Sequence, residues 1–173
     1  MRSNLVARIA LAAGAACAVV VSPGAAVAAP SGPDRPPAIQ LEDERGAAVS
    51  LDGFTGQVVL LDVWASWCAP CRAAFPEYDG LFKRYRSRGF HVLAVNVDER
   101  REDATRFLAA LPHDVQVAFD PVGRTPKALQ MRGMPTSYLV DRRGRIRFVH
   151  EGFTGKSLDI YRREIEQLLQ EAP

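Results

Sequence analysis

The run Val58–Trp64 is the feature of this sequence that most restricts its fold. Every residue in it except Asp62 is apolar, and the run has the length of a strand rather than of a helix. A strand that is apolar at consecutive positions is typical of a sheet covered by helices on both faces. Two cysteines, Cys68 and Cys71, follow closely, and a helical pattern begins after them. We therefore expect an α/β domain in which a central strand leads into a helix through a loop with two cysteines.

The rest of the chain alternates between strand and helix patterns and ends in an antiparallel pair and a helix. With 173 residues, 47% of them hydrophobic, it has the size and composition of one globular domain. We expect a mixed central sheet flanked by helices. The expected strands are Ile39–Leu41, Ala48–Leu51, His91–Val97, Val115–Phe119, Ser137–Val140 and Ile146–Val149, and the expected helices are Arg72–Arg86, Asp103–Leu111, Thr125–Met131 with Gly133 as its C-terminal cap, and Leu158–Gln170.

The first 28 residues have the three parts of a secretory signal peptide. Arg2 and Arg8 precede the uncharged apolar run Ile9–Val21, and small residues end the segment. An uncleaved membrane anchor is the alternative, but the run is shorter than the roughly 20 residues that a spanning helix needs. Lipidation at Cys17 is a weaker alternative, because the apolar run continues beyond this residue. We expect export to the periplasm with cleavage of the signal peptide.

After the signal peptide, we expect a proline-rich leader over residues 29–38 and one domain over residues 39–173. The chain that remains has equal numbers of basic and acidic residues, because the signal peptide removes two arginines and no acid. Such a balance gives no electrostatic footprint for nucleic acid or for an anionic membrane surface. We therefore expect neither of them as a partner.

The exported chain keeps only two cysteines, Cys68 and Cys71, separated by two residues. Two cysteines do not make the disulfide framework of a small secreted domain. A tetrahedral zinc site needs four ligands, and the three histidines show no paired spacing near each other or near the cysteines. A purely structural disulfide here would close too small a loop to add much stability. The pair therefore predicts a redox-active disulfide without a bound metal or cofactor.

The expected start of the helix gives the two cysteines different roles. A sulfur at the first turn receives backbone N–H groups and the positive end of the helix dipole, which stabilise a thiolate. Cys68 is thus the expected nucleophile, which would attack a partner's disulfide. Cys71 lies one turn further on and is better shielded, so it would resolve the mixed disulfide and release the product. Pro70 between them suits the first helical turn.

Two acidic residues are candidates for moving the proton that this exchange requires. Asp62 lies in the apolar strand, where burial is expected to raise its pKa and to make it a general base for Cys71. The alternative is an aspartate paired with a backbone group or an arginine. Glu99 follows the expected strand His91–Val97, at the edge where sites gather in open α/β sheets. The alternative for Glu99 is a solvated loop carboxylate.

The stretch Trp64–Arg72, with Pro76 shortly after it, resembles the active site of thioredoxin-fold proteins. The exported character, the leading hairpin, the additional strand and helix after Val97, and the turn Gly133–Thr136 are similar to the TlpA/ResA-like branch, which includes the CcmG-type proteins. The resemblance covers roughly residues 38–170. It implies a thioredoxin-like fold with an N-terminal β-hairpin and a βα insertion.

The resemblance also assigns roles to residues outside the cysteine pair. It matches Cys68 to the attacking cysteine, Cys71 to the resolving one, and Pro135 to the cis-proline that faces them. The backbone of Met134 would then bind the partner's chain as an added strand. Trp67, in the loop, is expected to pack over the dithiol and to contact partners.

Two acidic positions of this chain differ in how well they match the residues of this branch. The segment Asn96–Glu99 resembles the insertion motif of the branch, whose acid lies near the cysteines, and this supports Glu99 as a site residue. Asp62 departs from the branch, because many members carry Asn there and cytoplasmic thioredoxins carry Asp.

The resemblance implies a protein-disulfide reductase that acts on cysteines of other proteins, in cytochrome c maturation or oxidase assembly. A membrane thiol transporter would supply its electrons, and we expect a monomer. The local sequence leaves the direction of exchange open. Two alternatives remain: a copper chaperone for oxidase assembly, which usually has its cysteines three residues apart and a distant histidine, and a thiol peroxidase, which needs Pro and Thr before its cysteine, where this chain has Ala65–Trp67.

Overall fold

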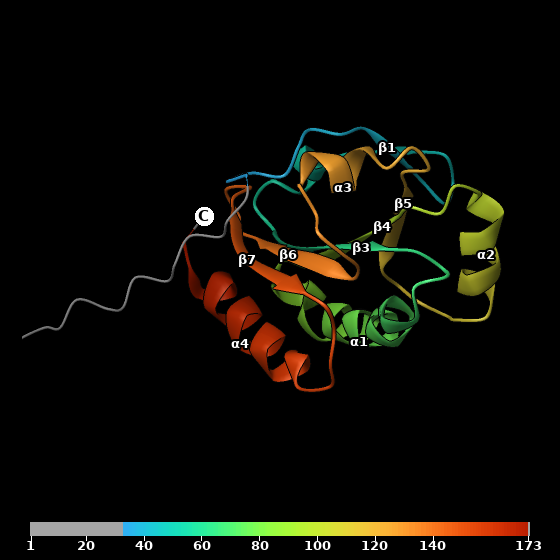
Figure 1. Cartoon of the computed structure of the whole chain (residues 1–173). Coiled ribbons are helices and arrows are strands. Elements are labelled where there is room, and N and C mark those ends of the chain that lie inside the picture. Colours follow the sequence, from blue (N-terminus) through green and yellow to red (C-terminus); the bar gives the residue numbers. More distant parts are fainter. Residues whose placement is uncertain (1–32, 173) are drawn as a thin grey trace, which may run out of the picture.

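The computed structural model describes residues 33–172 and shows one sheet between layers of helices (Figure 1). The expected signal peptide lies outside the described residues. The strands are β1 (Leu41–Asp43), β2 (Ala48–Val49), β3 (Val58–Trp64), β4 (Phe90–Asn96), β5 (Gln116–Phe119), β6 (Thr136–Val140) and β7 (Ile146–Glu151). The helices are α1 (Ala69–Tyr85), α2 (Arg101–Ala109), α3 (Arg124–Ala128) and α4 (Ser157–Gln170), with short 3₁₀ helices at Leu51–Phe54 and Arg86–Arg88.

The sheet is mixed, and β3 lies near its centre. Its seven strands have the order β2-β1-β5-β4-β3-β6-β7. β3 pairs with β4 in parallel and with β6 in antiparallel register, and β4 pairs with β5 in parallel. Strands β1–β2 and β6–β7 are antiparallel hairpins at the two edges. The expected thioredoxin-like α/β fold is confirmed, including the N-terminal hairpin and the inserted helix α2 followed by β5.

The two faces of β3 contribute to two separate parts of the core. Leu60 and Trp64 pack with α1 and α4, whereas Leu61 and Val63 pack with the other face, on which α3 lies (Figure 1). All seven residues of β3 are buried, because both of its neighbours are strands and both of its faces are covered. Asp62 lies inside this buried strand, at 1% exposure.

Helix α3 ends earlier than the sequence predicted, and its cap is a different residue. The helix stops at Ala128, and the residue with left-handed backbone is Gln130, at a φ of 53°, rather than Gly133. Two bonds close this end: Gln130 N donates to Lys127 O, and Met131 N donates to Pro126 O. This pair of bonds is the Schellman arrangement, which satisfies the last carbonyls of the helix. The prediction of Gly133 as the cap was therefore wrong.

Part of the expected leader is bound to the domain. Ile146 N at the start of β7 donates to Asp34 O at 2.8 Å, and the Arg35 guanidinium donates to Arg143 O at 2.8 Å. The segment around Asp34 is therefore held against the turn between β6 and β7. Among residues 33–172, no helix is both long and apolar enough to cross a membrane.

Candidate active site

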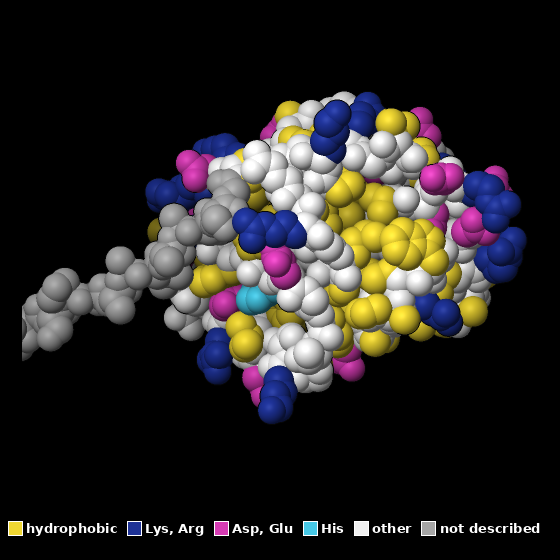
Figure 2. Space-filling model, in the orientation of Figure 1, with side chains coloured by type: hydrophobic (Ala, Val, Ile, Leu, Met, Phe, Trp, Pro, Cys, Tyr) yellow, Lys and Arg dark blue, Asp and Glu magenta, His cyan; other side chains and the backbone are white. Residues whose placement is uncertain are grey.

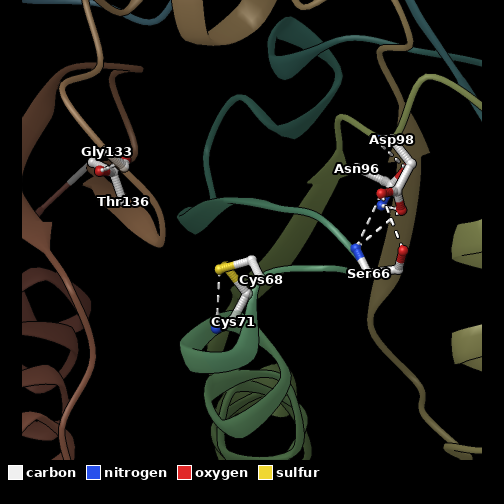
Figure 3. Close-up of a disulfide and its surroundings, with 7 residues drawn as sticks. All are labelled: Ser66, Cys68, Cys71, Asn96, Asp98, Gly133 and Thr136. Atoms are coloured by element: carbon white, nitrogen blue, oxygen red, sulfur yellow. Dashed lines mark hydrogen bonds between the residues drawn. A yellow bond between two sulfur atoms is a disulfide. The ribbon is translucent and has the colours of Figure 1, made fainter.

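Cys68 and Cys71 form a disulfide at the point where β3 leads into α1 (Figure 3). Their Cα atoms are 5.3 Å apart. Cys68 is the N-cap of α1, as expected, and its sulfur accepts a hydrogen bond from Cys71 N at 3.3 Å. The sulfur therefore lies on an orphan N–H group at the positive end of the helix, where a thiolate would be stabilised.

The two cysteines differ in access, although both are buried. Cys68 is 6% exposed and Cys71 is 1% exposed. The residues around Cys68 on the chain are open to solvent: Trp67 is 69% exposed, and Ala69 and Pro70 are exposed as well. A disulfide or thiol from another molecule can therefore approach Cys68 more easily than Cys71. This difference agrees with the predicted roles of the two sulfurs.

Asp62 is a buried carboxyl group without a hydrogen-bond partner among the described residues. Burial raises its pKa from 3.8 to about 8, since the charged form cannot be solvated there. Among residues 33–172, no arginine or backbone group is bonded to Asp62, in contrast to the alternative of a paired aspartate. At neutral pH, and with the disulfide formed, most Asp62 side chains carry a proton.

The alternation of β3 places Asp62 in the same layer as the disulfide. Asp62 lies between Leu60 and Trp64 in the strand, and both of these side chains pack in the core cluster that contains Cys68 and Cys71. A protonated carboxyl group in this layer can give its proton to a sulfur that leaves a disulfide. In the ionised form it can take the proton back.

The segment before β6 carries the expected cis peptide bond, between Met134 and Pro135. Thr136, the next residue, pairs with Val63 near the end of β3, which brings this segment beside the strand that leads to the cysteines. Figure 3 shows Gly133 and Thr136 on the opposite side of the disulfide from Ser66. Met134 is half-buried and packs against the same core as the cysteines.

A third acidic residue, Asp98, was not singled out from the sequence. Its buried carboxylate accepts from Ser66 N at 3.0 Å, from Ser66 Oγ at 3.1 Å and from Asn96 Nδ2 at 2.9 Å (Figure 3). Asn96 Oδ1 in turn accepts from Asp98 N at 3.1 Å. This cluster ties the loop that precedes Cys68 to the end of β4. The signal in the sequence was the polar pair Asn96 and Asp98 directly after an apolar strand.

Glu99 and Trp67 both point to solvent in the structure. Glu99 is exposed and makes no hydrogen bond or ion pair within the described part of the chain. Its placement fits the alternative of a solvated loop carboxylate, and Asp98 is the acid of this loop that contacts the loop before Cys68. Trp67 is largely exposed rather than packed. In residues 33–172, no group of three or more His, Cys, Asp or Glu side chains could hold a metal ion.

The Redoxin family model matches residues 32–169 of this chain. This span contains the whole sheet, the disulfide and the Met134–Pro135 bond. The chain belongs to the Redoxin family.

The chain is also similar to proteins of known sequence or structure. A crystal structure from Chlorobium tepidum, described as a thiol:disulfide interchange protein DsbE, is 42% identical, covers 82% of this chain and 99% of its own, and superposes with a TM-score of 0.77. The DsbE thiol:disulfide interchange protein of Xylella fastidiosa is 38% identical over 95 residues, which are 53% of this chain and 46% of that protein. The thiol-disulfide oxidoreductase ResA of Bacillus thuringiensis is 29% identical over 86 residues, half of each chain. The matches to the Xylella fastidiosa and Bacillus thuringiensis proteins thus span about half the length of those two proteins.

We expect the stability of this Redoxin protein to fall between pH 5 and pH 8 because of Asp62. The folded state keeps the Asp62 proton up to about pH 8, while the unfolded state loses it near pH 4, so rising pH favours unfolding in this window. The cost is on the order of 4 kcal/mol at pH 7. This cost is measured by denaturant unfolding of the oxidised wild-type protein and of the oxidised Asp62→Asn variant, each at pH 5 and at pH 8.

The comparison with Asp62→Asn isolates this one group. His91, whose pKa is lowered by burial, contributes in the same pH range with the opposite sign, but it does so equally in both proteins. We expect the difference in stability between the variant and the wild type to grow in favour of the variant as pH rises. Parallel pH profiles of the two proteins would contradict the assignment.

We expect Asp98→Ala to destabilise the domain, because it leaves the partly buried N–H of Ser66 and the buried amide of Asn96 without their acceptor. Each unpaired buried donor costs about 1–3 kcal/mol. Glu99→Ala is the matched control, since it removes an exposed neighbouring carboxylate that makes no bond, and it should change stability by less than about 0.5 kcal/mol. Chemical denaturation of both variants tests this, and equal losses would show that Asp98 does not hold the loop.

Proposed function

We propose that this protein is an exported thiol–disulfide oxidoreductase that exchanges disulfides with cysteines of other proteins and acts as their reductant. The observation that supports this most directly is the Cys68–Cys71 disulfide at the start of α1, with a carboxyl group that is protonated at neutral pH in the same layer. The names of its relatives, thiol-disulfide oxidoreductase and thiol:disulfide interchange protein, describe the same chemistry.

The first step uses the sulfur at the helix start. In the reduced protein, the Cys68 thiolate attacks one sulfur of a partner's disulfide, a new S–S bond forms, and the partner's other sulfur leaves as a thiolate that takes a proton from water. The backbone N–H of Cys71 and the dipole of α1 stabilise the Cys68 thiolate before the attack. The exposed Trp67 and the backbone of Met134 are the proposed contacts for the partner's chain.

The second step uses the buried sulfur and the buried acid. The thiol of Cys71 gives its proton to an ionised Asp62, and the resulting thiolate attacks the sulfur of Cys68. The mixed disulfide breaks, the partner leaves as a thiolate, and the Cys68–Cys71 disulfide forms. The product of this step is a protein with a closed disulfide and a protonated Asp62, in agreement with the disulfide and with the raised pKa of Asp62. In the reverse direction, Asp62 protonates the departing Cys71 sulfur.

The surface around Cys68 suits a protein substrate. Figure 2 shows hydrophobic side chains gathered over the region where Figure 1 places the end of β3 and the start of α1. Trp67 is the large exposed hydrophobic residue of this region. Aromatic residues of this kind are enriched in protein–protein contacts.

Localisation and the source of electrons belong to the same proposal. The predicted signal peptide over residues 1–28 would export the chain, and the leader would follow it. A membrane thiol transporter would return the disulfide to the dithiol form, and the substrates would be apoproteins of cytochrome c maturation or oxidase assembly. Glu99 is proposed as a further site residue only through the likeness of its segment to the insertion motif.

We expect Cys71→Ser to accumulate mixed disulfides with partner proteins, because the second step is blocked after Cys68 has attacked. The matched variant Cys68→Ser should form none, because the buried Cys71 cannot easily reach an outside disulfide. Non-reducing gels followed by mass spectrometry measure the adducts. Equal trapping by both variants would contradict the division of roles, and trapping by neither would contradict the proposed function.

We expect the reduction potential of the pair to lie closer to that of thioredoxin, about −270 mV, than to that of the strong oxidant DsbA, about −120 mV. Equilibration with glutathione buffers of known ratio, with Cys71→Ser as the variant that cannot form the disulfide, measures it. A value near the DsbA end would show that the protein forms disulfides in its partners rather than reducing them.

A further inference from the structure

Three hydroxyl groups from distant parts of the chain meet beneath the sheet. Tyr161 Oη of α4 lies 3.0 Å from Tyr78 Oη of α1 and 2.6 Å from Ser137 Oγ of β6. All three side chains are buried. Tyr78 follows Cys71 by seven residues on α1, which is two helical turns, so both lie on the face of α1 that packs on the sheet. We call these three groups the hydroxyl cluster.

The hydroxyl cluster has one more hydrogen than its internal bonds use. Each of the three hydroxyls carries one hydrogen, and two hydrogen bonds join them. Within residues 33–172, the other contacts of these side chains are ring packing, so one O–H group has no acceptor. A buried donor without an acceptor is unfavourable, and so is a buried acceptor without a donor. Asp62 supplies two such acceptors, because neither of its oxygens has a partner.

Asp62 and the hydroxyl cluster lie next to each other. Asp62 is the register partner of Ser137 across the β3–β6 pair, so their side chains are on the same face and their Cβ atoms are about 5 Å apart. Burial raises the pKa of Tyr78, and the Asp62 charge raises it further. Burial raises the pKa of Tyr161 as well, and there the Asp62 charge contributes less than the hydrogen bonds to Ser137 and Tyr78. For Tyr78, by contrast, the Asp62 charge contributes more than the hydrogen bond to Tyr161.

The elements around this region bring to it one other pair of titratable side chains and one cysteine sulfur. On β7, His150 is the register partner of Ser137, its ring packs on that of Tyr161 at 4.5 Å, and its Nε2 lies 2.6 Å from Glu164 of α4. On β4, the neighbour of Asp62 is Ala94, which does not titrate. On α1, the sulfur of Cys71 is the remaining group. Burial alone accounts for the raised pKa of Asp62, so no charged side chain compensates it.

We propose that Tyr78 is a positioning residue for Asp62: when Asp62 loses its proton, the two side chains move together and the Tyr78 hydroxyl donates its hydrogen to the carboxylate, which has no hydrogen-bond partner in the part of the chain that the structure describes. Ser137 then donates to Tyr161, and Tyr161 donates to Tyr78, so that all three hydrogens have acceptors. No covalent bond to a tyrosine or serine breaks, and the proton that Asp62 exchanges with Cys71 is the only one transferred. This inference rests on the proposed function, in which Asp62 and Cys71 exchange that proton.

The chain offers a matched pair of variants for the test. Tyr78 and Tyr85 are seven residues apart on α1, both are buried, and each hydroxyl bonds to a residue of α4, Tyr161 and Glu166 respectively. Tyr78→Phe and Tyr85→Phe therefore each remove one hydrogen bond between the same two helices. Of these two tyrosines, Tyr78 interacts with the Asp62 charge and Tyr85 does not.

The experiment follows the Asp62 carboxyl carbon by NMR during a pH titration of the oxidised full-length chain. We expect Tyr78→Phe to move the midpoint of Asp62 upward by about one pH unit, because the ionised form loses a hydrogen bond. Tyr85→Phe should leave the midpoint unchanged. Tyr161→Phe, which removes the group that orients Tyr78, should shift it in the same direction by less, and it serves as the second variant if Tyr78→Phe does not fold.

Equal midpoints in Tyr78→Phe and Tyr85→Phe would overturn the proposal, and so would a downward shift in Tyr78→Phe. The titration needs no partner protein, so its outcome does not depend on exchange activity. An upward shift in a protein that traps no partner through Cys71→Ser would support the link between Tyr78 and Asp62 and would reject the proposed function. The link between Tyr78 and Asp62 and the proposed function can therefore be rejected independently of each other.

Discussion

The burial of Asp62 is the constraint from which the chemistry of this site follows. The carboxyl group lies in the middle of β3, which has a strand on each side and a layer of side chains on each face. With no donor bonded to either oxygen, the charged form is unfavourable and the group holds its proton to about pH 8. The fold thereby keeps a proton in the same layer as a disulfide that needs one when it opens.

Asp98 shows that burial alone does not decide what an acid does. Like Asp62 it is almost fully buried, but Ser66 and Asn96 donate to it. A carboxylate with several donors can be stable where an unpartnered one is not. Asp62 therefore holds its proton at neutral pH, whereas Asp98 ties down the loop that precedes Cys68. Asp98 lies just beyond the end of β4, at the edge of the sheet where sites gather in open α/β folds, whereas Asp62 lies inside β3.

How much of this could be predicted from the sequence depends on how far apart the interacting residues are. The run Val58–Trp64 coincides with β3, because consecutive apolar residues leave few other solutions, and the spacing of Cys68 and Cys71 is local. The sequence does not show which of Asp98 and Glu99 contacts the loop before Cys68, because adjacent residues point in different directions and only the folded loop decides which one turns inward.

The contacts among Tyr78, Ser137 and Tyr161 could not be predicted, because they are long-range and no periodicity indicates them. Gln130 replaced Gly133 as a helix cap for a similar reason, since the last turn of α3 closed on its own backbone bonds.

The hydrogen bond from Cys71 N to the sulfur of Cys68 has a consequence for the strength of the pair as a reductant. A disulfide sulfur is a weak acceptor, whereas a thiolate at the same position would be a charged cap on the positive end of α1. Opening the disulfide thus strengthens the first turn of the helix, and this favours the dithiol form. The same contact that makes Cys68 reactive therefore limits how readily the protein gives up its electrons.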